Sequence, residues 1–224
     1  MSCHLFRKFD YNAFRMSIHL PKKSQAHYFA LNAFFLELLR SREISKETSI
    51  CQTRLHWWSQ TLKDIENDKK AREPVAVMLK KVKQETHVNF NLLHRMVDFQ
   101  LYDIDRGDIQ SIKELEVYAE NTRSMMLYMN LHLLGIDCPA STSAASHLGR
   151  ALGICDVIKK TPYYLAMHRG YLPTDIMLKH NLYFDRIWSK QGGEGIVADE
   201  FYDVLLEIAA YAKKHLEVAR EIQS

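Results

Sequence analysis

The chain has 224 residues, enough to bury one sizeable core without disulfides or a structural metal. Its 30 basic residues oppose 27 acidic ones, so the formal net charge is only +3, and no basic cluster with interleaved aromatic residues suggests nucleic-acid binding. No apolar run approaches the roughly 18 residues that a membrane-spanning helix requires.

The four cysteines, Cys3, Cys51, Cys138 and Cys155, lack the spacing of a zinc site or of a redox motif. They indicate free thiols in a reducing compartment. Residues 1–20 carry three basic residues against one acid, faintly like a mitochondrial targeting segment. They run directly into HLPKKSQ, where one helix pattern stops and another starts, so we expect them to be part of the fold and see no separate transit peptide.

Apolar residues recur every three or four positions along most of the chain, which predicts helices. In chain order, the predicted helices cover residues 5–20, 26–41, about 48–65, 74–85, 89–104, 112–135, 144–161, 172–181 and about 199–222. Ser24 and Ser45 are candidate N-caps, Gly135 suits a helix C-terminus, and Thr161-Pro162 is expected to end the Ala/Gly-rich helix. No segment shows strand alternation. The sequence therefore predicts an all-α fold, a single helical domain over residues 1–224.

Residues 26–41 are apolar nearly all round, which predicts a buried central helix. In residues 144–160, small side chains should let another helix approach closely. Asp156 and Lys160 lie four residues apart in that helix, in the favourable order for an ion pair. We expect the two to pair across one turn.

The segment DIENDKK places Asp64 and Asp68 on one face of a helix, provided that the helix persists. Two such carboxylates can hold Mg²⁺ together with a substrate diphosphate. The surrounding lysines favour a solvated helix end instead.

The segment YDIDRGD superficially resembles a calcium-binding loop that starts at Asp103 and includes Asp105. Such a loop needs glycine at its sixth position, where this chain has Asp108, with Gly107 one place early; Glu114 takes the twelfth. A turn is the favoured interpretation.

Arg54, His56, Trp57 and Trp58 form a dense cluster. An arginine and indole N–H groups can orient a polar head group, although large aromatic residues at helical spacing more often belong to the core. Cys51 and His56 have no obvious orienting acid, so nothing indicates nucleophilic catalysis.

The order of several motifs resembles the squalene/phytoene synthase superfamily. The similar segments are DYNAFRMSIHLPKKSQAHYFALNAFFLELLR, RLHWWSQTL, IKELEVYAENTRSM and GRALGICDVIKK followed by RGYLP. They occur in the family's order and cover nearly the whole chain. The resemblance implies a helical bundle of the isoprenoid synthase type, although the chain ends where that fold usually continues with further helices.

Active members of that superfamily hold Mg²⁺ and a prenyl diphosphate between two DxxxD motifs. By resemblance, the first motif falls near Leu39 and Glu43, and leucine cannot bind magnesium. The second falls on Lys160 and Tyr164. The positions that carry Asn and Arg before the second motif fall on Asp156 and Lys159. Both metal motifs are therefore broken, which implies a pseudoenzyme without catalytic residues, metal ligands or cofactors.

Within the superfamily, three segments resemble the branch of mitochondrial complex I assembly factors: IKELEVYAENT at 112–122, AASHLGRALGI at 144–154 and TPYYLAMHRGYLPTDI at 161–176. This resemblance implies a role in building NADH:ubiquinone oxidoreductase on the matrix side of the inner mitochondrial membrane. Expected partners are complex I subunits or other assembly factors, with peripheral membrane contact. The expected residues of the relict pocket are Glu37, Glu43, Arg54, Trp58, Asp156, Lys159, Lys160 and Tyr164.

Two alternatives remain open from the sequence. One is an active prenyl transferase that uses displaced carboxylates, chiefly Asp64 and Asp68 with Glu37 or Glu43. The other is a module that binds a lipid or isoprenoid in the relict pocket without chemistry.

Overall fold

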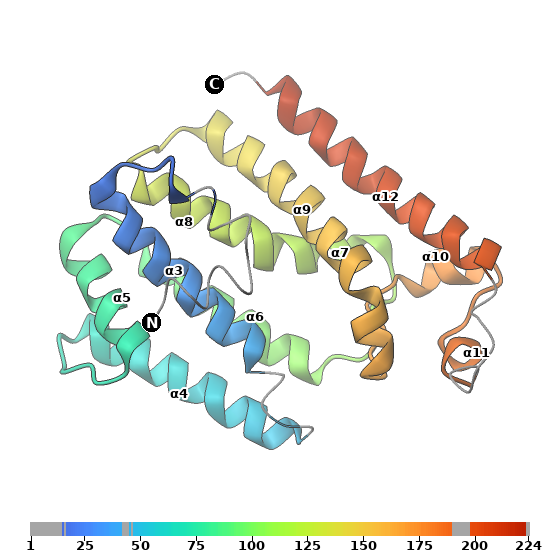
Figure 1. Cartoon of the computed structure of the whole chain (residues 1–224), viewed down its shortest axis with the longest axis horizontal. Coiled ribbons are helices and arrows are strands. Elements are labelled where there is room, and N and C mark those ends of the chain that lie inside the picture. The colour runs from blue at the N-terminus through green and yellow to red at the C-terminus, as the bar shows by residue number, and fades with distance from the viewer. Residues whose placement is uncertain (1–14, 16, 42–44, 46, 190–197, 223–224) are drawn as a thin grey trace. The chain divides into compact units, whose positions relative to one another are not determined.

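The computed structural model describes residues 15, 17–41, 45, 47–189 and 198–222. Every regular element among them is a helix, as predicted (Figure 1). The helices are α3 (Lys22–Arg40), α4 (Thr48–Glu66), α5 (Pro74–Glu85), α6 (Phe90–Asp105), α7 (Ile112–Ala119), the π-helical turn η1 (Glu120–Ser124), α8 (Met125–Leu133), α9 (Pro139–Ala166), α10 (Thr174–Lys179), α11 (Phe184–Ser189) and α12 (Ala198–Glu221). Most of the predicted first helix, residues 5–20, lies outside the described residues. Glu43 also lies outside them.

The chain forms two compact units. The first comprises Met1–Asp105 and Tyr128–Asp137, and the second comprises Arg106–Leu127 and Cys138–Ser224. The expectation of a single domain over residues 1–224 stays a prediction. Among the described residues, no helix is both long enough and apolar enough to cross a membrane. The described cysteines Cys51, Cys138 and Cys155 are free thiols, as predicted.

In the first unit, α3 and α4 supply most of the large buried side chains. Leu31, Phe34 and Leu38 of α3 are fully buried, and the ring of Phe34 meets the edge of Trp58 at a centroid distance of 5.1 Å. This confirms α3 as a core helix. Its predicted N-cap is wrong: the helix begins at Lys22 because the carbonyl of Pro21 already accepts the N–H of Ser24 at 2.8 Å.

Two lysines of α5 secure the end of α4. Lys83 Nζ donates to the carbonyls of Ile65 (3.2 Å) and Glu66 (2.7 Å), and Lys80 Nζ donates to the carbonyl of Asp68 (2.6 Å). The last carbonyls of a helix have no partner within the helix, so cations there stabilise both the end and the turn that follows it. The polar DIENDKK segment is thus a helix end, as favoured from its sequence.

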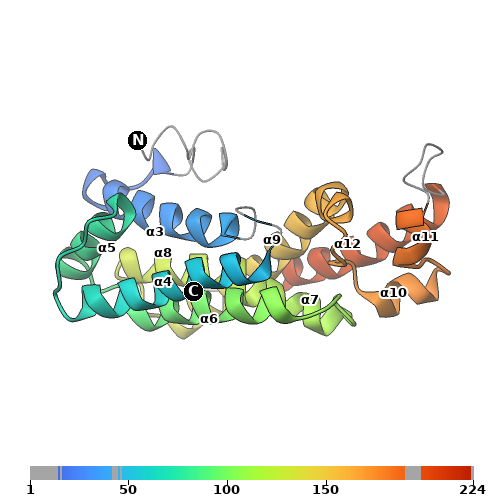
Figure 2. The same ribbon diagram turned by 90° about the horizontal axis from the view of Figure 1, so that it is seen from below.

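In the second unit, α12 runs back along α9, the longest helix of the described chain (Figures 1 and 2). We predicted that Thr161-Pro162 would end the helix, but α9 continues through Pro162 to Ala166. Proline removes one backbone hydrogen bond. Here Thr161 and Leu165 on either side are buried, and Thr161 Oγ1 donates to the carbonyl of Val157 at 2.8 Å. Tertiary packing therefore outweighs the local helix-breaking tendency.

Candidate functional site

The contact between α9 and the α7–η1 segment forms the frame of the candidate site. A Cβ atom on Gly149 would lie 2.4 Å from Cα of Ser124, and one on Gly153 would lie 2.5 Å from Cβ of Ala119. Any side chain at either glycine would displace the neighbouring helix. The close approach predicted from the small residues of α9 is therefore confirmed, and it draws the polar side chains of η1 against those of α9.

Asp156 on α9 accepts a hydrogen bond from Nε of Arg123 in η1, and both side chains are about a quarter exposed. The partner of Asp156 across the helix contact is therefore Arg123, and the predicted Asp156–Lys160 pair stays a prediction. A pair within one helix adds only about 0.3–0.5 kcal/mol, whereas Arg123 approaches across the helix contact as a partly desolvated charge partner. Lys159 and Lys160 both have exposed side chains.

Two further polar links join α9 to the same segment. Glu120 of η1 accepts hydrogen bonds from Nε of Arg150 and Oγ of Ser146, each at 2.9 Å. One turn earlier along the chain, a link to α12 follows: Oε1 of Glu116 on α7 lies 3.0 Å from Nε2 of His215 on α12. The Glu120 links and the Arg123–Asp156 bond join η1 to α9, whereas the Glu116 link joins α7 to α12.

A histidine pair extends the Glu116 link. Nδ1 of His147 on α9 lies 2.9 Å from Nδ1 of His215, so one of these nitrogens must donate while the other accepts. Burial lowers the pKa of His147, and positive charge on His215 and Arg150 adds to the effect. A neutral His147 ring is therefore the natural partner of His215.

Tyr164 belongs to an aromatic cluster. Its ring stacks on Tyr171 with centroids 4.2 Å apart, and Tyr118 meets Tyr171 edge-on at 5.2 Å. The guanidinium carbon of Arg106 lies 5.1 Å from the centroid of Tyr171 and 5.7 Å from that of Tyr118. This part of the site holds phenol rings and a guanidinium cation.

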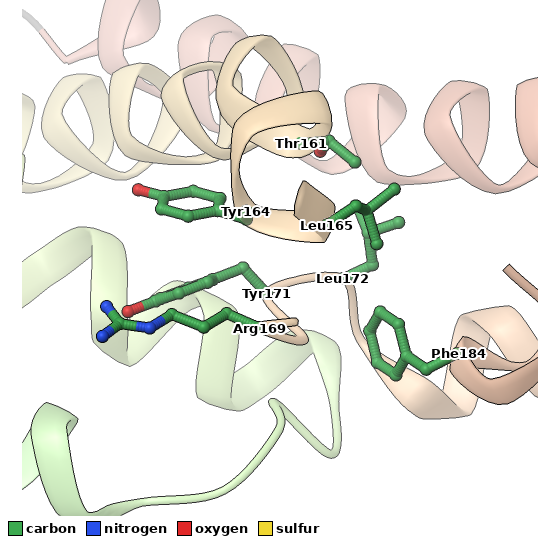
Figure 3. Close-up of a pocket in the computed structure, with 7 residues that line it drawn as sticks. All are labelled: Thr161, Tyr164, Leu165, Arg169, Tyr171, Leu172 and Phe184. Carbon is green, nitrogen blue, oxygen red and sulfur yellow. The ribbon is translucent and has the colours of Figure 1, made fainter. Parts of the chain in front are cut away.

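A small pocket adjoins this cluster (Figure 3). It is lined by Thr161, Tyr164, Leu165, Arg169, Tyr171, Leu172 and Phe184. Figure 3 shows Tyr164 and Tyr171 as a layered pair on one side of the pocket and Phe184 on the other. Its cavity volume is about 0 Å³, so the pocket is a shallow depression without room for an organic ligand.

The loop Asp105–Asp108 has a structural role, as the favoured turn interpretation predicted. Asp108 Oδ1 accepts the backbone N–H of Gly170 at 3.0 Å, and the N–H of Ile109 donates to the carbonyl of Gly170 at 2.9 Å. Asp105 accepts from Nε2 of Gln52 at 2.7 Å. These carboxylates fix the backbone and side chains around them and do not form a calcium loop.

The candidates in the first unit lie on α3 and α4. Arg54 of α4 donates from its NH2 nitrogen to Glu37 of α3 at 2.9 Å, and its guanidinium carbon lies 4.9 Å from the ring centroid of Trp57. Trp58 is fully buried, and its Nε1 lacks a hydrogen-bond acceptor among the described residues, as does the buried Nε of Arg54. The structure thus brings Glu37, Arg54 and Trp58 together.

Asp64 and Asp68 do not form a pair on one helix face. The helix ends at Glu66, and Asp68 follows it with a left-handed backbone, φ 55°. Asp64 accepts from Lys69 Nζ at 2.9 Å, a bond that lowers the pKa of Asp64, and Asp68 accepts from Lys83 Nζ at 3.1 Å. Each carboxylate thus has an ammonium partner. Over the described ranges, no cluster of three His, Cys, Asp or Glu side chains is arranged to hold a metal ion.

The comparison with protein families decides the family. A model described as squalene/phytoene synthase matches residues 6–224. The chain belongs to the squalene/phytoene synthase family. The resemblance stated from the sequence motifs is therefore confirmed.

Two solved synthase structures share the fold. A dehydrosqualene synthase crystal structure with bound ligand superposes with a TM-score of 0.80 at 20% identity, covering 98% of this chain and 75% of that one. The squalene synthase HpnC from Alicyclobacillus acidocaldarius gives a TM-score of 0.73 at 15% identity, covering 98% and 87%. At these identities the likeness shows the all-α fold of the isoprenoid synthases.

The curated relatives are named as complex I assembly factors and not as synthases. The chain is 35% identical over 216 residues to NADH dehydrogenase (ubiquinone) complex I, assembly factor 6, of Homo sapiens, covering 96% of this chain and 63% of that protein. It is 26% identical over 196 residues to the homologue in Dictyostelium discoideum, covering 87% and 54%. The chain spans less than two thirds of these relatives.

Sequence reasoning missed several residues of this site. The sequence pattern shows only that Arg123 lies in a predicted helix and that Arg106 lies beside one, so it does not identify either arginine as a site residue. Tyr171 was noted in the YLP motif without a partner. A seven-residue step separates Tyr164 from Tyr171, but the stack depends on the chain reversal at the end of α9, which residue spacing does not show.

Proposed function

We propose that this chain is a non-catalytic member of the squalene/phytoene synthase family that takes part in the assembly of mitochondrial respiratory complex I. The observation that carries the non-catalytic part is the cluster at Tyr164. Where the family motif has its second aspartate, Tyr164 stacks on Tyr171, and Arg106 lies against the same ring system.

The residues at this place do not fit magnesium. Mg²⁺ prefers carboxylate and phosphate oxygens in octahedral geometry. The positions of the two aspartates hold Lys160 and Tyr164, and the nearby carboxylate of Asp156 already accepts from Arg123. Ionising an allylic diphosphate needs strong electrophilic assistance, and one ammonium group supplies far less than a set of metal ions.

The alternative with displaced carboxylates finds little support in the geometry. Asp64 is bonded to Lys69, Asp68 to Lys83 and Glu37 to Arg54. Releasing any of these carboxylates for metal binding would break an existing charge pair. A non-catalytic protein is the simpler interpretation.

The assembly part of the proposal is supported by the relatives. Proteins of several organisms that match over most of this chain are named complex I assembly factor 6 or its homologues. We therefore place the chain in mitochondria, on the matrix side of the inner membrane, where it would act on early complex I intermediates through contact with subunits or other assembly factors. Membrane contact would be peripheral, and a lipid or isoprenoid is a possible ligand in this account.

Depletion and rescue test this proposal. Cells that make the protein are depleted of it, and mature complex I is quantified on native gels. We expect a selective loss of complex I, restored by the wild-type chain and equally by Asp64→Asn/Asp68→Asn, because no carboxylate chemistry is required. Affinity purification from mitochondria should recover early complex I intermediates. Unchanged complex I after depletion would refute the assembly role, and loss of rescue by a folded double variant would favour the enzyme.

A further inference from the structure

We infer that the first unit contains a binding pocket for a small organic anion, located between α4 and the loop that leads into α5. The cavity has a volume of about 200 Å³. Its lining includes Trp57, Thr61 and Ile65 of α4, Lys70 and Arg72 of the loop, and Ala76 of α5. The pocket does not depend on the residues of the family's metal motifs or on the proposed assembly role.

One part of the pocket is apolar. Ile65 and Ala76 are each only 1% exposed, whereas Trp57 remains 39% exposed. An exposed indole offers a flat apolar surface on which a ring can stack. This side of the pocket therefore selects a ligand with a ring or a comparable apolar group.

The loop side supplies unmatched positive charge. Lys69 is neutralised by Asp64 at 2.9 Å, and the carboxylate of Glu73 accepts the N–H of Ala76 at 2.8 Å as the cap of α5. Lys70 and Arg72, by contrast, have neither a hydrogen bond nor an ion pair with any residue that the structure describes. A carboxylate or phosphate is the natural partner for an arginine and a lysine on one rim.

The loop is held in place before any ligand arrives. Lys80 Nζ donates to the carbonyls of Asp68 and Lys69 at 2.6 and 2.9 Å, which ties the loop to α5. A fixed loop reduces the ordering entropy that a ligand must overcome. Pockets for drug-sized ligands usually measure about 300–1,000 Å³. This smaller cavity therefore fits one ring that carries a single acidic group.

Calorimetric titration with phenyl phosphate tests the site, with inorganic phosphate and neutral phenol as comparison ligands. We expect saturable binding of phenyl phosphate at millimolar or lower concentration, weaker binding of inorganic phosphate and none of phenol. Lys70→Gln/Arg72→Gln should weaken phenyl phosphate binding about tenfold or more, because hydrogen bonds to charged groups contribute about 1.5–3 kcal/mol. Trp57→Leu should weaken phenyl phosphate and leave inorganic phosphate unchanged.

The matched control is Lys81→Gln, which removes an exposed lysine of α5 that does not line the pocket. It should leave the affinity unchanged, and circular dichroism checks that each variant remains folded. Absence of saturable phenyl phosphate binding to the wild-type chain would overturn the inference. Equal weakening by Lys81→Gln and by the double variant would also overturn it, since general charge attraction would then explain the binding.

Discussion

Arg123 of the π-helical turn donates its Nε–H to the carboxylate of Asp156 on α9, 33 positions later in the chain. A π-turn shifts the side chains that follow it around the helix axis relative to an α-helix, and such turns often occur at functional sites. Here Ser124 of the turn lies against Gly149 of α9, and Ala119, just before the turn, lies against Gly153. The bond thus fixes an acidic side chain at the contact between η1 and α9.

Removing either partner of this bond should destabilise the second unit. Arg123→Gln and Asp156→Asn should each lower the free energy of unfolding by about 1–2 kcal/mol, because the remaining charge is partly desolvated. Urea denaturation of both single variants and the double variant should give a coupling energy of about 1 kcal/mol. Lys159→Gln, an exposed change one turn along α9, is the control and should cost less than about 0.5 kcal/mol. A coupling energy near zero would contradict the ion-pair account.

The glycine contact predicts a cost for one added methyl group. Gly153→Ala would place Cβ 2.7 Å from Cα of Ala119, so the two helices must separate. Overpacking costs about 1–3 kcal/mol, and the better helix propensity of alanine returns up to about 1 kcal/mol. We expect a net loss of about 1–2 kcal/mol in thermal or urea unfolding. Gly107→Ala, where nothing lies within 4 Å of the new Cβ, should be nearly neutral. A stabilised Gly153→Ala variant would show that the helices are not in close contact.

The His147–His215 pair predicts that the fold weakens in acid. Burial lowers the pKa of His147 below its ordinary value of 6.5, with a further contribution from positive His215 and Arg150, against which Glu120 and Glu116 act. As the pH falls below about 6.5, the unfolded chain therefore binds more protons than the folded chain. The free energy of unfolding decreases from that pH down to the lower pKa that His147 has in the folded chain.

Thermal unfolding between pH 7.5 and 5.5 measures this effect. The melting temperature of the wild-type chain should fall more steeply with acidification than that of His147→Gln, which cannot gain the proton. His56→Gln, on the exposed side of α4, serves as the control and should follow the wild-type curve. Identical pH dependence in the wild type and His147→Gln would exclude His147 as the titrating group.

The sequence predicts most helices well because periodic apolar residues and strong end signals act locally. Pro74 opens α5 and Gly135, with φ 70°, follows the end of α8, as expected. Where packing decides, the local signals mislead. Pro162 lies inside α9 because buried neighbours hold the helix together, and the π-turn at 120–124 interrupts a segment that reads as one continuous helix.

In the candidate site, too, local sequence signals predict some features, whereas others depend on tertiary packing. The small residues of α9 correctly predict a close helix contact, because glycine at a contact position has direct steric consequences. The sequence displays Lys160 four residues from Asp156 but conceals Arg123, which only the fold brings near Asp156. The structure brings Glu37 and Arg54 into contact in the first unit, whereas the wider set of relict-pocket residues stays a prediction.

The central claim is that the metal site of the family has been replaced by ion pairs and an aromatic stack. Calorimetric titration of the purified chain with farnesyl diphosphate, in the presence and absence of Mg²⁺, tests this most directly. We predict no magnesium binding and no magnesium-dependent heat of prenyl diphosphate binding, because Lys160, Tyr164 and the Arg123-bound Asp156 cannot provide the oxygen ligands that Mg²⁺ requires. Saturable, magnesium-dependent binding of the diphosphate would contradict the claim.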